Sequence, residues 1–269
     1  MEIKDFNTLL DHKLITNVDL ADYYLNNTEA LDELADTDLM SMGILSQPTV
    51  NDIIKTTGVA SLRPILNQDD LMERIEMGHP IKLTNDLVLD TCIIINGQDA
   101  SIDLNGYSIT AGIFTESNGD ITEGDTDSYV FWVKDGSLAI FGNGDVIAQP
   151  AKYSIAVWCQ GGAVLLDGGN YYNGEDSDLI YASGSGNVKI LNGYFKAGEN
   201  NGPGTKNKYS VLNIKDKDRA TASIEVMGGK YYMFDPANNL SEGENTNFVH
   251  PDYTSITADD INYSVILSI

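Results

Sequence analysis

Acidic residues are the side chains of this sequence most able to do chemistry, because two carboxylates held over a groove can cleave a glycosidic bond. Such a pair needs a fixed separation and one carboxyl group with a raised pKa. Asp167 stands at a glycine-containing turn, but the positions that align with it in similar stretches of the chain are not acidic. They hold Asn105, Phe141, Leu191 and Met227. We therefore expect no catalytic carboxylate pair.

Basic and nucleophilic side chains are equally scattered. A polysaccharide lyase would use a lysine or arginine base beside a calcium cluster, but Lys189 and Lys230 are isolated in the sequence. His12, His79 and His250 lie far apart and form neither an HxxxH motif nor a Ser/His/Asp set. No glycine-rich stretch has the GK[ST] ending of a phosphate-binding loop. These patterns predict a protein that is not an enzyme and that carries no cofactor.

The segment 110–128 leaves calcium binding open. The acidic side chains considered as ligands are Asp120, Glu123, Asp125 and Asp127. Hard oxygen ligands at alternate positions suit calcium, but the residue order of an EF-hand loop is absent. A solvated acidic loop is the favoured interpretation, and we predict no metal site.

Tyrosine pairs at 171–172 and 231–232 suggest stacking on sugars. Side chains alternate between the two faces of a strand, so one tyrosine of each pair is expected to point into the core. The favoured interpretation is therefore a core tyrosine beside a surface tyrosine.

The overall charge excludes several partners. The 269 residues include 40 acidic and 16 basic side chains, for a net charge of −24. Nucleic acids and anionic membranes need Lys and Arg to neutralise phosphate, so we expect neither as a partner. The two cysteines, Cys92 and Cys159, lie in apolar runs and are expected to be buried, reduced thiols. We find no signal peptide and no apolar run long enough to span a bilayer, and expect a soluble protein.

From Ile81 onward the sequence repeats one strand pattern. The five copies are IDLNGYSI (102–109), LAIFGNGDVI (138–147), VLLDGGNYY (164–172), VKILNGYF (188–195) and IEVMGGKYY (224–232). Their basic period is 24–26 residues, and two longer intervals contain inserts at 110–128 and 196–208. Before most copies lies another strand, as at 129–133, 154–158, 178–182 and 210–214. Self-similarity at such a period is typical of solenoids.

The repeat predicts a mainly β fold, a right-handed parallel β-helix of three short strands per coil over residues 81–234. The right hand follows from the general preference of parallel crossovers. We expect the second apolar position of the copies to form one interior row, the core ladder Leu104, Ile140, Leu166, Ile190 and Val226. A third apolar position falls on Ile109, Tyr171, Phe195 and Tyr231, and the second copy slips by one to Val146.

Short-helix patterns precede the β region. In residues 67–80, Asn67 can cap a helix whose Leu71 and Ile75 share a face and which Gly78 ends, and we expect this helix to cap the first coil. Residues 1–66 are interpreted as a helical anchoring and oligomerisation region that docks on a larger assembly; packing on the β-helix as a cap is an equally weighted alternative. The candidate docking residues are Leu9, Leu10, Ile15, Leu20, Tyr24, Leu25, Leu31, Leu34 and Leu39.

Residues 235–269 are predicted to cap the other end. Asp235 can cap a helical turn that begins at Pro236, so that the chain folds across the last coil. The final strand, 262–269, is too apolar for a free tail, and we expect it to cover the last coil or to pack against another chain.

Two stretches resemble a known family. KLTNDLVLDTCIIINGQDASIDLNGYSIT (82–110), with its DLNGY turn, and MGGKYYMFDPANNLSEGENTNFVHPDYTSI (227–256) are similar to segments of pectate-lyase-like β-helix proteins, in particular structural proteins of gut phages. The resemblance covers roughly residues 80–269. It implies a β-helix in a virion and implies no catalytic residues, because these motifs are architectural.

Taken together, the sequence predicts a non-enzymatic phage virion structural protein, a capsid-attached head fibre or decoration protein. We expect a homotrimer that is made in the bacterial host cytoplasm, resides in the virion and has the phage capsid or other virion proteins as partners. The alternative is a tailspike-type protein that binds or depolymerises host-surface carbohydrate.

Overall fold

The computed structural model describes residues 65–78, 80–114, 126–174, 177–198, 211–259 and 261–268. This part of the chain is mainly β, as predicted, with one α-helix, one short 3-10 helix and a single 14-stranded sheet. The elements are α5 (Gln68–Glu76), β1 (Ile81–Lys82), β2 (Leu87–Leu89), β3 (Ile93–Asp103), β4 (Ser108–Ala111), β5 (Asp127–Ile147), β6 (Tyr153–Cys159), β7 (Ala163–Tyr172), β8 (Ile180–Ala182), β9 (Asn187–Lys196), β10 (Leu212–Ile214), η2 (Asp216–Asp218), β11 (Ser223–Val226), β12 (Lys230–Tyr232), β13 (Tyr253–Thr257) and β14 (Asn262–Leu267).

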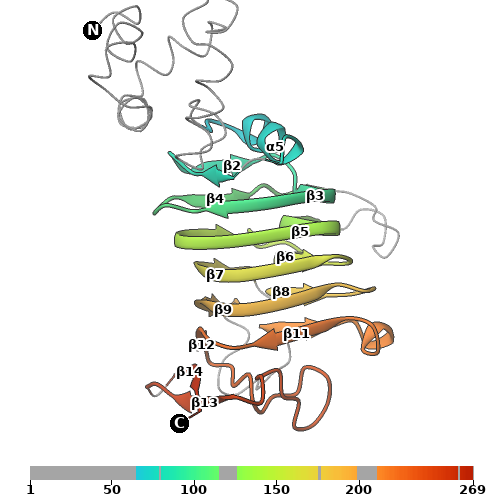
Figure 1. The fold of residues 1–269 in the computed structure, drawn as a ribbon, viewed down its shortest axis with the longest axis vertical. Coiled ribbons are helices and arrows are strands. Elements are labelled where there is room, and N and C mark those ends of the chain that lie inside the picture. Colours follow the sequence, from blue (N-terminus) through green and yellow to red (C-terminus); the bar gives the residue numbers. More distant parts are fainter. Residues whose placement is uncertain are drawn as a thin grey trace, which may run out of the picture.

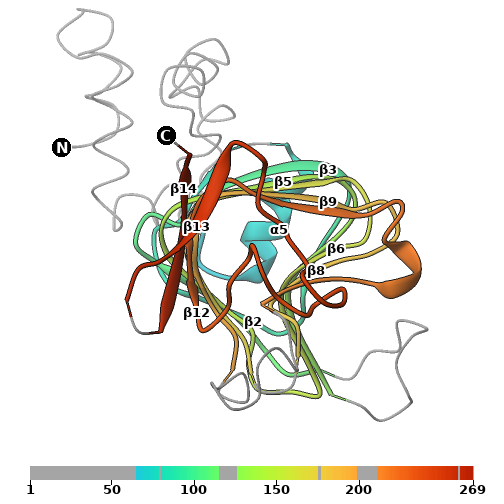
Figure 2. The ribbon, with the colours of Figure 1, turned by 90° about the horizontal axis from the view of Figure 1, so that it is seen from below.

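The sheet is curled and largely parallel, and its strands lie above one another as rungs (Figure 1). Three walls can be followed. The first contains β1, the end of β3, the middle of β5, the beginnings of β7 and β9, and β11. The second contains β2, β4, the ends of β5, β7 and β9, and β12. The third contains the beginnings of β3 and β5, then β6, β8 and β10. Figure 2 shows these walls curling around a common interior.

Register pairs in the first wall align one apolar row through six rungs. Every member of this row is at most 3% exposed. The row consists of Ile81, Ile102, Ile140, Leu166, Ile190 and Val226. Four of the five predicted ladder residues therefore line up.

The prediction was wrong for Leu104. Ile102, not Leu104, pairs with Ile140. Leu104 is fully buried, but it lies past the strand, and its backbone N–H donates to the carbonyl oxygen of Phe141 at 3.0 Å. The corner between β3 and β4 is longer than the corresponding corners of the later copies, so the residue that begins this corner was mistaken for the one that ends the wall.

An aromatic column fills the interior behind the second wall. Tyr171 stacks on Phe195 with ring centroids 4.9 Å apart, and Phe195 stacks on Tyr231 at the same distance. All three side chains are fully buried. Tyr172 and Tyr232 are only partly buried, so the prediction of one inward tyrosine in each pair is confirmed.

The third wall has apolar side chains on both faces. Inside lie residues such as Val157 and Cys159, both fully buried. Outside, Trp132 and Trp158 stack with centroids 4.5 Å apart, and Phe114 packs edge-on against Tyr129 beside them. Both cysteines are buried and free of a disulfide, as predicted.

Helix α5 covers the first rung, at the top of Figure 1. The Asn67 side chain accepts a hydrogen bond from the Asp70 backbone N–H, Leu71 and Ile75 are buried, and Gly78 has a φ of +66°. These are the cap, the face and the helix end that the sequence predicted.

At the other end the chain turns across the last rung. Asp235 accepts a hydrogen bond from the backbone N–H of Ala237 at 3.0 Å, which makes a tight turn and not a helix. The final strand β14 pairs antiparallel with β12 and then with β13. It therefore covers the edge of the last rung, one of the two positions expected for it.

Candidate functional site

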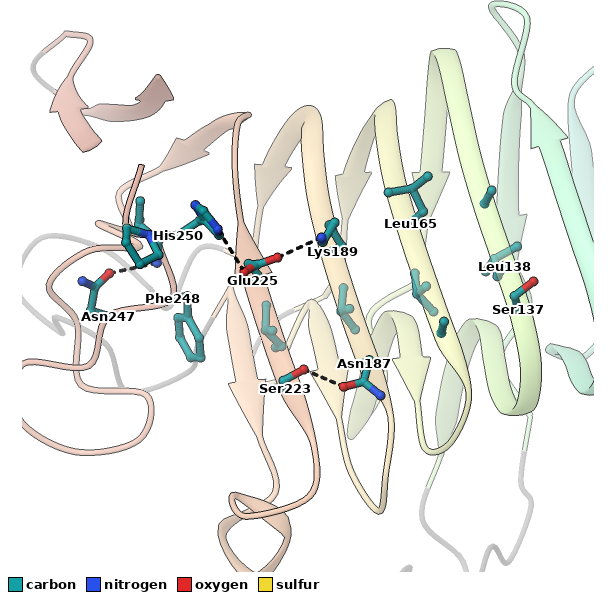
Figure 3. A pocket seen from close by; sticks show the side chains of 17 residues that line it. Ser137, Leu138, Leu165, Asn187, Lys189, Ser223, Glu225, Asn247, Phe248 and His250 are labelled. Carbon is teal, nitrogen blue, oxygen red and sulfur yellow. Dashed lines mark hydrogen bonds and ion pairs between the residues drawn. The ribbon is translucent and has the colours of Figure 1, made fainter. Parts of the chain in front are cut away.

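The outer face of the first wall carries a hollow of about 760 Å³ (Figure 3). Small side chains, among them Ala139 and Ala163, face outward on β5 and β7 and leave this space open. The segment 247–251 borders the hollow at the end next to β11. The backbone of this wall is the same ladder whose inward residues form the buried row. The repeat that builds the core therefore also sets the spacing of the side chains in the hollow.

A polar row runs along one side of the hollow. Ser137 donates a hydrogen bond to the carboxylate of Asp99 at 2.6 Å, and Ser223 donates one to the amide oxygen of Asn187 at 2.7 Å. The row is interrupted on β7, where Ala163 lies in register between Ser137 and Asn187.

A charged row lies beside it. Lys189 Nζ is 3.1 Å from a carboxylate oxygen of Glu225, and His250 Nε2 is 3.8 Å from the other. The Nδ1 atom of His250 accepts a hydrogen bond from the backbone N–H of Asp252 at 3.2 Å, so the imidazole is held on both sides. Figure 3 shows Lys189, Glu225 and His250 following one another along the hollow.

Lys189 and Lys230 are isolated in the sequence, but the fold brings each of them to one carboxylate. Lys189 and Glu225 face each other because their strands pair in that register. Lys230 Nζ lies 3.4 Å from Asp259, in the connection between β13 and β14. Glu225 and His250 were not singled out from the sequence, although the repeat alignment itself places Lys189 and Glu225 at equivalent positions.

The hollow offers hydrogen bonds and charge but no pair of carboxylates. Of the residues that line it, Glu225 is the one acid. Asp167 lies elsewhere, on an outward row that aligns it with Asp103, Phe141 and Asn192. The expectation that no aligned position is acidic was therefore wrong, since Asp103 and not Asn105 shares this row. Asp103 accepts a hydrogen bond from the backbone N–H of Asn105 at 2.9 Å and so fastens a corner. The lining side chains offer hydrogen bonds and charge to a polar ligand.

A second group of side chains gathers on the outer face of the second wall. Tyr172 and Tyr194 meet with ring centroids 6.2 Å apart, and Lys196 Nζ lies 4.8 Å from the centre of the Tyr232 ring. Partial burial raises the pKa of Tyr172, with Asp145 adding to the effect. Partial burial also raises the pKa of Tyr194, helped by Tyr232. These tyrosines and the hollow lie on different walls.

The remaining predicted site residues lie outside the described residues. They are the candidate docking residues Leu9, Leu10, Ile15, Leu20, Tyr24, Leu25, Leu31, Leu34 and Leu39, the acidic residues Asp120, Glu123 and Asp125, and the histidines His12 and His79. Asp127 is described; it is buried and accepts a hydrogen bond from the Tyr129 hydroxyl at 3.1 Å.

Within the described ranges, no three His, Cys, Asp or Glu side chains gather in a way that could hold a metal ion. No helix in this part of the chain is long and apolar enough to cross a membrane. In comparisons with known proteins, no family model, no curated protein and no solved structure matches the chain.

Proposed function

We propose that residues 81–234 form a right-handed parallel β-helix and that the protein is a non-enzymatic structural component of a phage virion, a capsid-attached head fibre or decoration protein. The observation that carries this proposal is the apolar row of the first wall, which runs in register through six rungs and is almost entirely excluded from water. Stacking of equivalent rungs makes a stiff, quasi-one-dimensional column, which suits a projecting part.

The handedness and the virion setting rest on separate supports. Parallel strands joined by a crossover are right-handed in about 98% of cases, which favours a right-handed coil. The similarity of segments 82–110 and 227–256 to phage β-helix proteins favours the virion. In this proposal residues 1–66 dock on the capsid, three copies assemble there, and the acidic column projects outward.

The test is made on particles. The chain is looked for by mass spectrometry in virions purified by density gradient from a phage that encodes it, and is located by immunogold labelling with antibodies raised against residues 81–234. We expect labelling on the head. Absence from purified particles would overturn the virion assignment.

The docking role of residues 1–66 needs its own experiment. Full-length protein and protein lacking residues 1–60 are added to particles made without the gene. We expect only the full-length chain to bind. Equal binding of both would remove the anchoring role while leaving the virion assignment intact.

A second candidate function is carbohydrate binding of the tailspike type. It is favoured by the outward tyrosines Tyr172, Tyr194 and Tyr232, which lie on successive rungs of one wall. Aromatic side chains with a polar tip suit contact with sugars. Affinity for capsular polysaccharide that is lost in Tyr194→Ala would support this function, and a fall in polysaccharide viscosity would add depolymerisation to it.

A further inference from the structure

The lower end of the stack leaves one strand edge without a neighbour. In the first wall, the edge of β11 is closed by the segment 248–250, since Val226 N–H donates to the Phe248 carbonyl at 2.8 Å. In the third wall, the Ile214 N–H at the edge of β10 donates to the carboxylate of Glu242 at 2.6 Å. In the second wall, β12 is followed by β14 and β14 by β13. Within the described residues nothing pairs with the outer edge of β13, which lies at the bottom of Figure 1.

The hydrogen-bonding groups on this outer edge can be identified from the register. Backbone bonds between the two strands alternate, and Ser268 N–H to the Asp252 carbonyl and Ala258 N–H to the Asn262 carbonyl mark the residues of β13 that face β14. Ser255 and Thr257 therefore direct their N–H and C=O groups away from β14. This edge can accept another strand.

The edge also lacks the devices that keep strand edges from pairing. Charged side chains and proline are the usual protection. Neither β13 nor β14 contains a charged residue or a proline, although 21% of the chain is charged. Ile256 and Ile266 are 42% and 43% exposed on neighbouring strands, and Leu267 is 59% exposed. An uncharged, partly apolar edge is left open in a strongly acidic protein.

We propose that this edge is a self-association site, at which β13 pairs antiparallel with β13 of a second copy about a two-fold axis. Ser255 would lie opposite Ser255 of the second copy, and Thr257 opposite Tyr253, so that each outward N–H meets a carbonyl. Ile256 would then pack beside Thr254 of the second copy, on the exposed face that Ile266 extends. A strand that pairs with itself in this way satisfies the isologous rule of two-fold interfaces.

Charge limits where a second copy can approach. Two copies that each carry a charge of −24 repel one another, whereas the strands β13 and β14 themselves carry no charged side chain. The acids beside β13 are Asp252 and Asp259, and Asp259 lies 3.4 Å from Lys230. Salt screens the remaining repulsion, so association strengthens as ionic strength rises. The pairing is independent of where the protein functions.

The test compares two substitutions that change the charge equally. Ile256→Lys places a charge in the middle of the proposed interface, whereas Val88→Lys places the same charge on β2 at the far end of the stack, at a residue 70% exposed. Sedimentation velocity of the full chain is run from 1 to 100 µM protein at 50 and 500 mM NaCl. At high salt, we expect the wild type and Val88→Lys to sediment with the mass of the assembly paired through β13. We expect Ile256→Lys to sediment with half that mass.

The criterion is that the mass of the Ile256→Lys assembly is half that of the wild type. This ratio is expected whether or not residues 1–66 add a further assembly step. A three-copy assembly through residues 1–66 that Ile256→Lys leaves unchanged would overturn this proposal without touching the proposed function. Wild-type protein that stays monomeric up to 100 µM at 500 mM NaCl would also overturn it.

A backbone variant covers the case in which Ile256→Lys does not fold. Thr257→Pro removes an outward N–H and leaves the bonds to β14 in place, as proline does on edge strands. It is expected to halve the mass too, and hydrogen exchange at Ser255 and Thr257 is expected to slow in the wild type as protein concentration rises. Exchange that is equally fast at every concentration would contradict the pairing.

Discussion

Among single residues, the aromatic column holds two buried hydroxyl groups in different surroundings. The Tyr231 hydroxyl donates a hydrogen bond to the Gly228 carbonyl at 3.0 Å. The Tyr171 hydroxyl is buried and has no hydrogen-bond partner among the described residues. A buried polar group without a partner opposes folding, whereas a satisfied one contributes modestly to stability.

This difference predicts opposite results for the same substitution. Tyr231→Phe should lower the free energy of unfolding by about 1 kcal/mol, because a hydrogen bond is lost. Tyr171→Phe should leave it unchanged or raise it by up to about 1 kcal/mol, because only an unpaired hydroxyl is removed. Urea unfolding followed by circular dichroism measures both. Equal losses in the two variants would contradict the assignment.

The buried thiol predicts a loss of stability in alkali. Burial raises the pKa of Cys159 from 9.0 to about 12, so the folded protein keeps a proton that the unfolded chain releases. The contribution is complete below pH 9 and is lost as the pH rises from about 9 to 12. Burial also raises the pKa of Tyr231, which acts in the same direction above pH 10.

The measurement is the urea midpoint of the wild type and of Cys159→Ala between pH 8 and 11. Both midpoints should fall with rising pH, and the fall should be shallower in the variant. A thiol reagent added at pH 8 should modify Cys159 only on unfolding. Rapid modification of the folded protein would show that the thiol is not buried.

Sequence reasoning at this scale found which tyrosines face inward and missed which charges meet. Strand alternation settles the first, since Tyr171 and Tyr231 occupy equivalent places in two copies. Lys189 and Glu225 are 36 residues apart in the sequence and meet only because β9 and β11 pair in one particular register. A single charged residue does not reveal its partner until that register is known.

Among the elements, the corners between walls decide where each strand ends. Gly162 joins the third wall to the first with a φ of +71°, and a Cβ there would collide with the backbone of Gly136 on the preceding rung. Gly106 also has a positive φ, +88°, but nothing lies within 4 Å of the position that its Cβ would occupy. Gly106 is required only for its positive φ, whereas Gly162 is required both for its positive φ and because a Cβ would not fit.

Alanine substitution should therefore cost different amounts. Gly106→Ala should lower the free energy of unfolding by about 1–2 kcal/mol, the price of a left-handed conformation. Gly162→Ala should add roughly 1–3 kcal/mol to that cost, because neighbouring rungs must move apart. Thermal or urea unfolding distinguishes them. A loss in Gly162→Ala no larger than in Gly106→Ala would mean that the rungs are not in close contact at this corner.

The helix cap offers a further prediction at this scale. Asn67→Ala should destabilise the protein by about 1 kcal/mol, because the Asp70 N–H loses its acceptor, whereas Asn67→Asp should restore most of the stability. The measurement is again the free energy of unfolding. Equal loss in both variants would show that the side chain does not act as an N-cap.

The misplaced Leu104 shows why elements were easier to predict than their register. A slip of one residue turns every side chain to the other face, but a slip of two keeps the apolar pattern intact. The corner of the first sequence copy runs from Ile102 to Ile109, whereas that of the third copy runs from Leu166 to Tyr171. An alignment that assumed equal corners therefore chose Leu104, two residues late, and only the backbone pairing reveals the difference.

For the whole molecule, stacking is the property from which the rest follows. The interior row, the aromatic column and the outer hollow all arise because each rung repeats the one above. The repeat period predicted a mainly β, stacked architecture, and the capping residues predicted the helix over its first rung. The final strand was expected to cover the last rung or to pack against another chain, and its pairing with β13 was not predicted. Where the chain functions has no comparable signal in the described residues, since architectural repeats carry no chemistry of their own.

The most direct test is an experimental structure of the full chain at a resolution that shows side chains. Our account predicts right-handed coils in which Ile102, Ile140, Leu166, Ile190 and Val226 lie on successive rungs about 4.8 Å apart and face one interior. A structure in which these five side chains fall on different faces, or in which their strands run antiparallel, would contradict it.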